Sequence, residues 1–249
     1  MPPDISKKPE RKIVPAFLFA SNISELAISV VIGEIFLMGM QGCFISLSER
    51  DLDSVFEDPS RLQILLEIEG GTEVGQEVDE IIEKLGEFAA ENDVPEEVRH
   101  SIKGLRDSRE ERDDSWEPEA KPEFLDIDKS WHGIHFLLTG SHSEGSGPLA
   151  FILQGGREIP TDDFGYGPPH AFTATEVREI NQALNRVSPD ELYSKADPDQ
   201  FTELDIYPGI WDSEPKEESI GYLTDYLKEL QTFIKQAAAS DRALIAYIG

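Results

Sequence analysis

The side chains of this sequence best suited to chemistry are aromatic rings and imidazoles that carry a hydrogen-bonding group. Such side chains combine a large contact area with a polar tip, which is typical of ligand grooves and of the centres of protein interfaces. Together with one carboxylate at a predicted helix start, they form the candidate pocket or interface. Its members are Asp128, Trp131, His132, His135, Tyr166, His170, Tyr207 and Trp211. The competing interpretation is that these rings only pack loops onto the core.

His132 and His135 are the strongest candidates for metal or acid–base chemistry. Their spacing of three residues could direct two imidazoles on one helix towards the same ligand. His135 lies on the apolar face of this predicted helix with Trp131, whereas His132 is about 100° around the helix. No HExxH motif or equivalent ligand pattern is present in the chain. We therefore expect no metal ion and no cofactor, and we expect His135 to be a hydrogen-bonded histidine of the core.

Motifs for covalent or phosphate chemistry are missing as well. The chain contains no G-x-S-x-G elbow, no P-loop and no G-x-G-x-x-G sequence. Its single cysteine, Cys43, lies in a predicted strand and not at a helix N-terminus, so a small buried hydrophobe is expected there. No catalytic residue can therefore be assigned. We expect a protein that binds a partner protein or a small ligand and does not catalyse a reaction. The alternative is a hydrolase that pairs His132 or His135 with a carboxylate.

Helical patterns position most of the candidate residues. Asp128 is a natural N-cap for a helix with an apolar face around Trp131 and His135, and Gly140 ends this helix. The longest helix is expected over about 215–239. Further helices are predicted to start after the N-caps Thr173, Ser188 and Asp197.

Strand patterns are confined to a few short segments. Apolar and β-branched runs predict strands over about 42–47 and about 243–248, and we expect these first and last strands to pair in one small sheet. Residues 148–154 favour a short helix, with a buried strand as the alternative. Many helices and few strands indicate an α+β, helix-dominated single domain.

The chain carries 50 acidic and 22 basic residues among 249, a formal net charge of −28. This field repels phosphate backbones and anionic lipids, so we expect neither nucleic acid nor a membrane as a partner. Residues 61–122 contribute −11 and are predicted to be an acidic helical insertion, while the remaining −17 is spread over the rest of the chain. The charge suits a basic protein partner, as for an immunity protein that counters a toxin, or else adaptation to a salty cell.

The first 37 residues differ from the rest of the chain. Four basic residues within 1–12 precede a mostly apolar run that continues to Leu37. A membrane-spanning helix would have to bury two glutamates, and a secretory or lipoprotein signal would be interrupted by polar residues. We favour a third interpretation, a mis-assigned start codon, with the protein beginning at Met38 or Met40.

Five segments of the sequence form a recognisable set: MGMQGCF at 38–44, LDIDKSWHGIHFLLTG at 125–140, FGYGP at 164–168, IYPGIW at 206–211 and ALIAYIG at 243–249. In this order and spacing they resemble the bacterial YfbM-like family. The resemblance covers about residues 38–249. It implies a compact, soluble α+β domain in the cytoplasm, but no activity, because the family is one of unknown function. Residues 1–37, an N-terminal extension, and the acidic helical insertion at about 61–122 lie outside the family pattern.

Overall fold

The computed structural model describes residues 40–70, 72–92, 94–110, 115–161 and 167–249. Contacts divide the chain into a unit of residues 1–38 and a unit of residues 39–249, and the fold below is that of the second unit. The expectations for the N-terminal extension and for Tyr166 fall outside the described residues. Within the described part, no helix is both long enough and apolar enough to cross a membrane.

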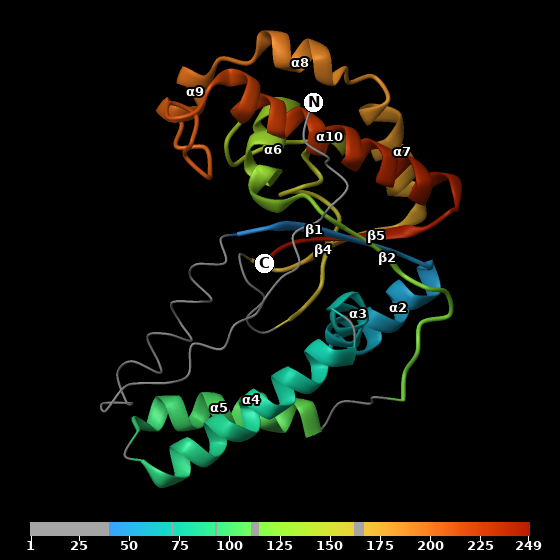
Figure 1. Cartoon of the computed structure of the whole chain (residues 1–249). Helices are drawn as coiled ribbons and strands as arrows, with labels where there is room; N and C mark the ends of the chain where they lie inside the picture. The colour runs from blue at the N-terminus through green and yellow to red at the C-terminus, as the bar shows by residue number, and fades with distance from the viewer. Residues whose placement is uncertain (1–39, 71, 93, 111–114, 162–166) are drawn as a thin grey trace, which may run out of the picture. The chain divides into compact units, whose positions relative to one another are not determined.

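An antiparallel sheet of five strands forms the centre of this unit, in the order β2-β1-β5-β4-β3 (Figure 1). The strands are β1 (Gly42–Leu47), β2 (Glu123–Asp126), β3 (Arg157–Glu158), β4 (His170–Phe172) and β5 (Ala243–Ile248). Strands β1 and β5 pair along their whole length, from Gly42 opposite Ile248 to Leu47 opposite Ala243. The predicted pairing of the first and last strands is thereby confirmed.

Helices make up most of the remaining structure, which confirms the helix-dominated α+β class. They are α2 (Glu49–Glu57), α3 (Arg61–Gly70), α4 (Thr72–Glu91), α5 (Glu96–Glu110), α6 (Trp131–Thr139), α7 (Ala174–Leu184), α8 (Pro189–Lys195), α9 (Pro198–Glu203) and α10 (Lys216–Ala239), with the short 3₁₀ helices η1 (Asp128–Ser130) and η2 (Pro148–Ala150). The side chains of Thr173, Ser188 and Asp197 each accept a backbone N–H at a helix start, as predicted.

Both faces of the sheet are covered by helices (Figure 1). Because side chains alternate along a strand, β1 and β5 contribute to two different hydrophobic clusters. Phe44 and Leu244 join the larger cluster, which includes the buried faces of α6, α7 and α10. Ile45 and Ile245 join the second cluster, together with α2 and α3. The two central strands are therefore buried throughout.

Helices α3 to α5 occupy the region of the predicted acidic helical insertion. Helices α4 and α5 pack against each other, and α4 packs against α3. Arg99 of α5 donates hydrogen bonds to the carbonyls of Ala89 and Asn92 at the end of α4. Farther along the chain, the buried carboxylate of Asp51 in α2 accepts the backbone N–H of Glu119 at 2.8 Å, which ties the returning segment to the core.

The structure corrects three predictions of local secondary structure. Asp128 is not the N-cap of α6: it opens η1 with a φ of +50°, and α6 begins at Trp131, after Ser130. Residues 148–154 form a 3₁₀ helix followed by a turn and not a regular helix. Strands β2, β3 and β4 were not predicted, because segments of four, two and three residues are too short to show an alternating pattern.

An alanine at Gly133 should destabilise the fold, because α6 and α10 meet there. A Cβ at Gly133 would lie 2.6 Å from Cδ1 and 2.7 Å from Cδ2 of the fully buried Leu223. We expect Gly133→Ala to lower the free energy of unfolding by about 1–3 kcal/mol, the usual cost of an overfilled core. Urea denaturation measures this change.

The matched control is Gly221→Ala in α10, where an added Cβ meets nothing within 4 Å. Alanine favours a helix over glycine, so this variant should gain up to about 1 kcal/mol. Similar effects of the two substitutions would contradict the close packing of α6 on α10.

Candidate functional site

Trp131 is the centre of the candidate site, and the sequence of β1 makes room for it. A Cβ at Gly42 would lie 2.5 Å from Cβ of Trp131 and 3.0 Å from Cγ1 of Ile127. Glycine therefore lets Trp131 approach the β1 backbone closely. The indole Nε1–H donates to the carbonyl of Met40 at 3.0 Å, and only 5% of the residue is exposed. Trp131 thus fixes α6 to the start of β1.

Two further candidate residues stack with Trp131. Its ring centroid lies 4.9 Å from that of His132 with an interplanar angle of 13°, and 5.7 Å from that of Tyr207 with an angle of 26°. His132 follows Trp131 on α6, whereas Tyr207 comes from the loop between α9 and α10. The structure thus brings three candidates together in one aromatic stack: Trp131, His132 and Tyr207.

Both ring nitrogens of His132 are hydrogen-bonded to the backbone. Nδ1 accepts the N–H of Tyr207 at 3.0 Å, so the ring proton is on Nε2, which donates to the carbonyl of His142 at 2.6 Å. Burial lowers the pKa of His132 below its ordinary value of 6.5; His142 lowers it further, while the bond to the His142 carbonyl opposes this shift. The neutral ring joins two loops and has no nitrogen left to accept a substrate proton.

His135 is fully buried and hydrogen-bonded, as expected for a core histidine. Its Nε2 donates to the carbonyl of Glu144 at 3.3 Å, which leaves Nδ1 as a buried acceptor with no hydrogen-bond partner among the described residues. Burial lowers the pKa of His135, and the bond to Glu144 opposes the shift. A side chain without exposed surface does not reach a substrate in this conformation.

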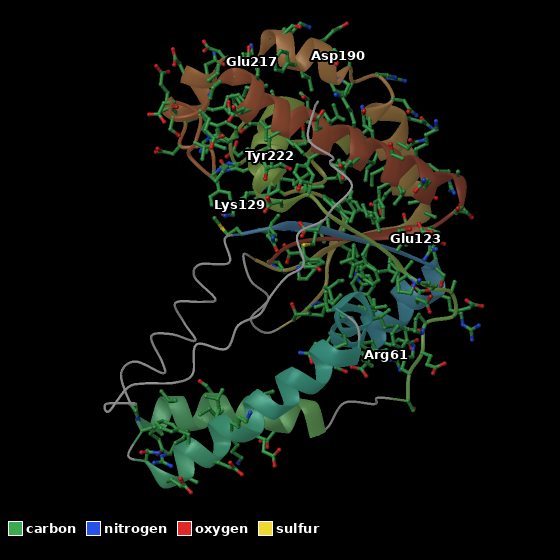
Figure 2. The ribbon with its side chains drawn as sticks, in the orientation of Figure 1. Arg61, Glu123, Lys129, Asp190, Glu217 and Tyr222 are labelled. Carbon is green, nitrogen blue, oxygen red and sulfur yellow. The ribbon has the colours of Figure 1, made fainter. Side chains whose placement is uncertain are left out.

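Asp128 contacts α10. Tyr222 donates its hydroxyl to Oδ2 of Asp128 at 3.1 Å. Gln41 Nε2 lies 3.5 Å from Oδ1, the other carboxylate oxygen of Asp128. Figure 2 shows Tyr222 of α10 close to Lys129 of η1. Burial, followed by the charge of Asp128, raises the pKa of Tyr222. The hydroxyl therefore remains a donor at neutral pH and locks η1 to α10.

The remaining candidates lie apart from the aromatic stack. Trp211 is a core residue, whose Nε1–H donates to the carbonyl of Ile206 at 2.5 Å and whose ring lies 4.8 Å from that of Phe201. His170 lies on β4, with Nδ1 2.8 Å from the carbonyl of Gly155. The candidates that the structure describes therefore do not form one exposed site: Asp128 and the aromatic stack surround the start of α6, His135 and Trp211 are buried in the core, and His170 lies on β4.

This arrangement joins segments that are far apart in the chain. Cys43 is buried in β1, as expected. Among the described residues, no group of three His, Cys, Asp or Glu side chains is placed to hold a metal ion. The hydrogen bonds of Trp131 and His132 all lead to backbone groups, and the carboxylate of Asp128 accepts from Tyr222 and Gln41. What the aromatic stack does is hold the loop of Tyr207 in place.

The loop of Tyr207 is part of a strongly acidic segment that the sequence analysis did not single out. Residues 190–218 contain ten Asp or Glu and two Lys, a net charge of −8. All ten carboxylate residues are exposed, and they form what we call the acidic surface: Asp190, Glu191, Asp197, Asp199, Glu203, Asp205, Asp212, Glu214, Glu217 and Glu218. Figure 2 shows Asp190 on α8 and Glu217 at the start of α10. A local count of charges would have found this segment.

The two lysines of residues 190–218 both contact other groups of the protein. Lys195 pairs with Glu191 at 3.4 Å. Lys216 donates to the carbonyl of Ala196 at 2.6 Å and lies 5.2 Å from the centre of the Tyr193 ring. The other nine carboxylates form no ion pair with any described residue. Most of the negative charge on this surface is therefore not neutralised by a cation of the described residues.

Comparisons with known proteins give a family but no activity. A family model with the description "Domain of unknown function (DUF1877)" matches residues 38–247. Among solved structures, the chain is similar to a protein of unknown function, YfbM, from Escherichia coli, with 15% identity and a TM-score of 0.49, over 84% of this chain and 99% of that chain. The comparison with curated proteins finds no match.

Removal of the Tyr222 hydroxyl tests the lock between η1 and α10. We expect Tyr222→Phe to lower the free energy of unfolding by about 1–2 kcal/mol, because the Asp128 carboxylate loses its hydroxyl partner. Thermal and urea denaturation measure the loss. Tyr226→Phe is the matched control: its ring lies 5.0 Å from that of Tyr222, but its hydroxyl forms no hydrogen bond with a described residue. An equal loss in both variants would argue against the lock.

Proposed function

This chain belongs to the DUF1877 family, a domain of unknown function, and we propose that it is a binding protein whose acidic surface engages a basic segment of a partner protein. The family match over residues 38–247 confirms the resemblance inferred from the sequence. The family description assigns neither ligand nor reaction. Support for the proposal therefore comes from the charges and contacts of the molecule itself.

The observation that carries the proposal is the set of nine exposed carboxylates without a described cation partner. Like charges held on one surface repel one another, and this cost is relieved when a surface of opposite charge approaches. A basic segment would also be steered to this surface, which raises the rate of association. Such a complex weakens as salt screens the charges.

Rigidity of the segment supports the same proposal. Ile206 and Trp211 are buried at either end of the turn that lies between α9 and α10, and the aromatic stack holds Tyr207 between them. Asp205 and Asp212 flank this fixed turn. A surface that is ordered before binding loses less conformational entropy on association, so more of the electrostatic attraction appears as affinity.

The hydrolase alternative finds no supporting observation. A general base must reach a substrate proton with a free nitrogen or oxygen. His132 uses both nitrogens for backbone bonds, and His135 has no exposed surface. We therefore propose binding without catalysis, in the cytoplasm, with neither nucleic acid nor membrane as the partner.

A charge-neutralising variant tests the proposal. The combined substitutions Glu203→Gln, Asp205→Asn, Asp212→Asn and Glu214→Gln remove four charges from the acidic surface, and asparagine tolerates the positive φ of Asp205. We expect this variant to bind a poly-L-lysine peptide at least about tenfold more weakly at low salt. Isothermal titration calorimetry measures the affinity.

The control variant removes the same charge from another exposed region: Glu83→Gln, Glu87→Gln, Glu91→Gln and Glu96→Gln in α4 and α5. Its affinity should stay close to that of the unmodified protein. Equal weakening in both variants would show that the peptide senses only the total charge, as expected if the acidity serves only solubility in salt. That result would overturn the proposal.

A further inference from the structure

We infer that His132 is a proton-sensitive latch: addition of a proton to its ring releases Tyr207 and weakens binding at the acidic surface. The effect on a partner rests on the proposed binding function. Release of Tyr207 can be measured in the protein without a partner. The latch and the proposed binding function can therefore be refuted independently.

The latch follows from the two hydrogen bonds of the His132 ring. A second proton must go to Nδ1, the nitrogen that accepts the N–H of Tyr207 at 3.0 Å. Two donors then face each other, and this bond is lost. The hydrogen bond from Nε2 to the carbonyl of His142 at 2.6 Å is retained. The His132 ring also keeps its orientation, because it stacks on Trp131 with an interplanar angle of 13°. The contact that is lost is therefore the one to the backbone N–H of Tyr207, whereas the Tyr207 ring still stacks on Trp131.

The surroundings of His132 do not compensate an added positive charge. No described carboxylate forms an ion pair with His132. Burial lowers the pKa of the ring, and the neighbouring His142 lowers it further. Charged or titratable residues on the elements around it include His135 on α6, His142 and Glu144 in the loop after α6, Asp205, Tyr207, Asp212 and Glu214 in the turn, Asp128 and Lys129 on η1, and Tyr222 and Tyr226 on α10.

Release of Tyr207 reaches the acidic surface because this residue lies within it. Asp205 precedes Tyr207 by two positions, and Asp212 follows it by five. Ile206 and Trp211 remain anchored in the core, with 0% and 1% of their surfaces exposed. Opening is therefore confined to the turn between these two anchors, and it increases the freedom of the flanking carboxylates without unfolding the domain.

The direction of the pH effect follows from the lowered pKa of His132. The folded protein binds this proton less readily than the unfolded chain, whose histidine has the ordinary value of 6.5. The stability that the neutral ring provides is complete above pH 6.5 and is lost as the pH falls below that value. Carboxylates, with reference values of about 3.9 to 4.3, remain mostly ionised down to about pH 5.

Hydrogen exchange of the Tyr207 amide tests the latch in the protein alone. We expect its protection factor, measured by NMR on the full chain, to fall about fivefold or more between about pH 7.5 and about pH 5, as expected for a lost hydrogen bond. His132→Asn, whose side-chain oxygen can accept near the position of Nδ1 without titrating, should remove this dependence. Unchanged protection of Tyr207 in the unmodified protein would overturn the latch, whatever the variant does.

Affinity for the poly-L-lysine peptide tests the coupling to the acidic surface. We expect binding by the unmodified protein to weaken about fivefold over the same range, while His132→Asn shows no such change. His142→Asn, which removes an exposed ring and keeps the backbone carbonyl, should retain the pH dependence. A constant affinity despite loss of Tyr207 protection would overturn the coupling. Absence of binding at both pH values would contradict the proposed function, and the exchange measurement would still decide the latch.

Discussion

The close approach of Trp131 to Gly42 is the contact on which the surrounding structure depends. Strand β1 lies in the middle of the sheet and is buried throughout, so a helix that packs over its start must fit against backbone. Glycine at position 42 provides the space, and the indole bond to Met40 sets the orientation of the ring. Once Trp131 is placed, His132 follows it on α6, and Tyr207 can stack beside both.

Two polar contacts then extend this arrangement to distant parts of the chain. His132 joins α6 to the turn before α10, and Tyr222 joins α10 to η1 through Asp128. Both contacts depend on a proton in a defined place: on Nε2 of the histidine and on the hydroxyl of the tyrosine. Because Tyr207 lies within residues 190–218, the contact that His132 makes with it also fixes the turn that carries Asp205 and Asp212 of the acidic surface.

Local sequence patterns were sufficient for the longer regular elements, but not for the short strands β2, β3 and β4. The capping box of Thr173 and the apolar runs of β1 and β5 each specify an element within a few residues, and these elements were predicted correctly. The role of Asp128 could not be found this way. Its partner Tyr222 is 94 positions away in the chain, and a carboxylate before a helix looks the same whether it caps that helix or bonds elsewhere.

The candidate site was predicted only in part, for a similar reason. An aromatic ring with a polar tip suits both a binding surface and the core, and only the tertiary structure separates Trp211, which is buried, from Tyr207, which joins the stack. The acidic surface differs, since its composition is visible in the sequence. It was overlooked because the charge was averaged over long segments, whereas the structure shows that ten exposed carboxylates follow one another between residues 190 and 218.

The most direct measurement of the central claim is an NMR titration of the ¹⁵N-labelled protein with a lysine-rich peptide, which reports where a basic segment binds. The account predicts that amide shift changes concentrate in residues 190–218, around Tyr207, and diminish as salt is added. Shift changes centred on α4 and α5, or no changes at low salt, would contradict it.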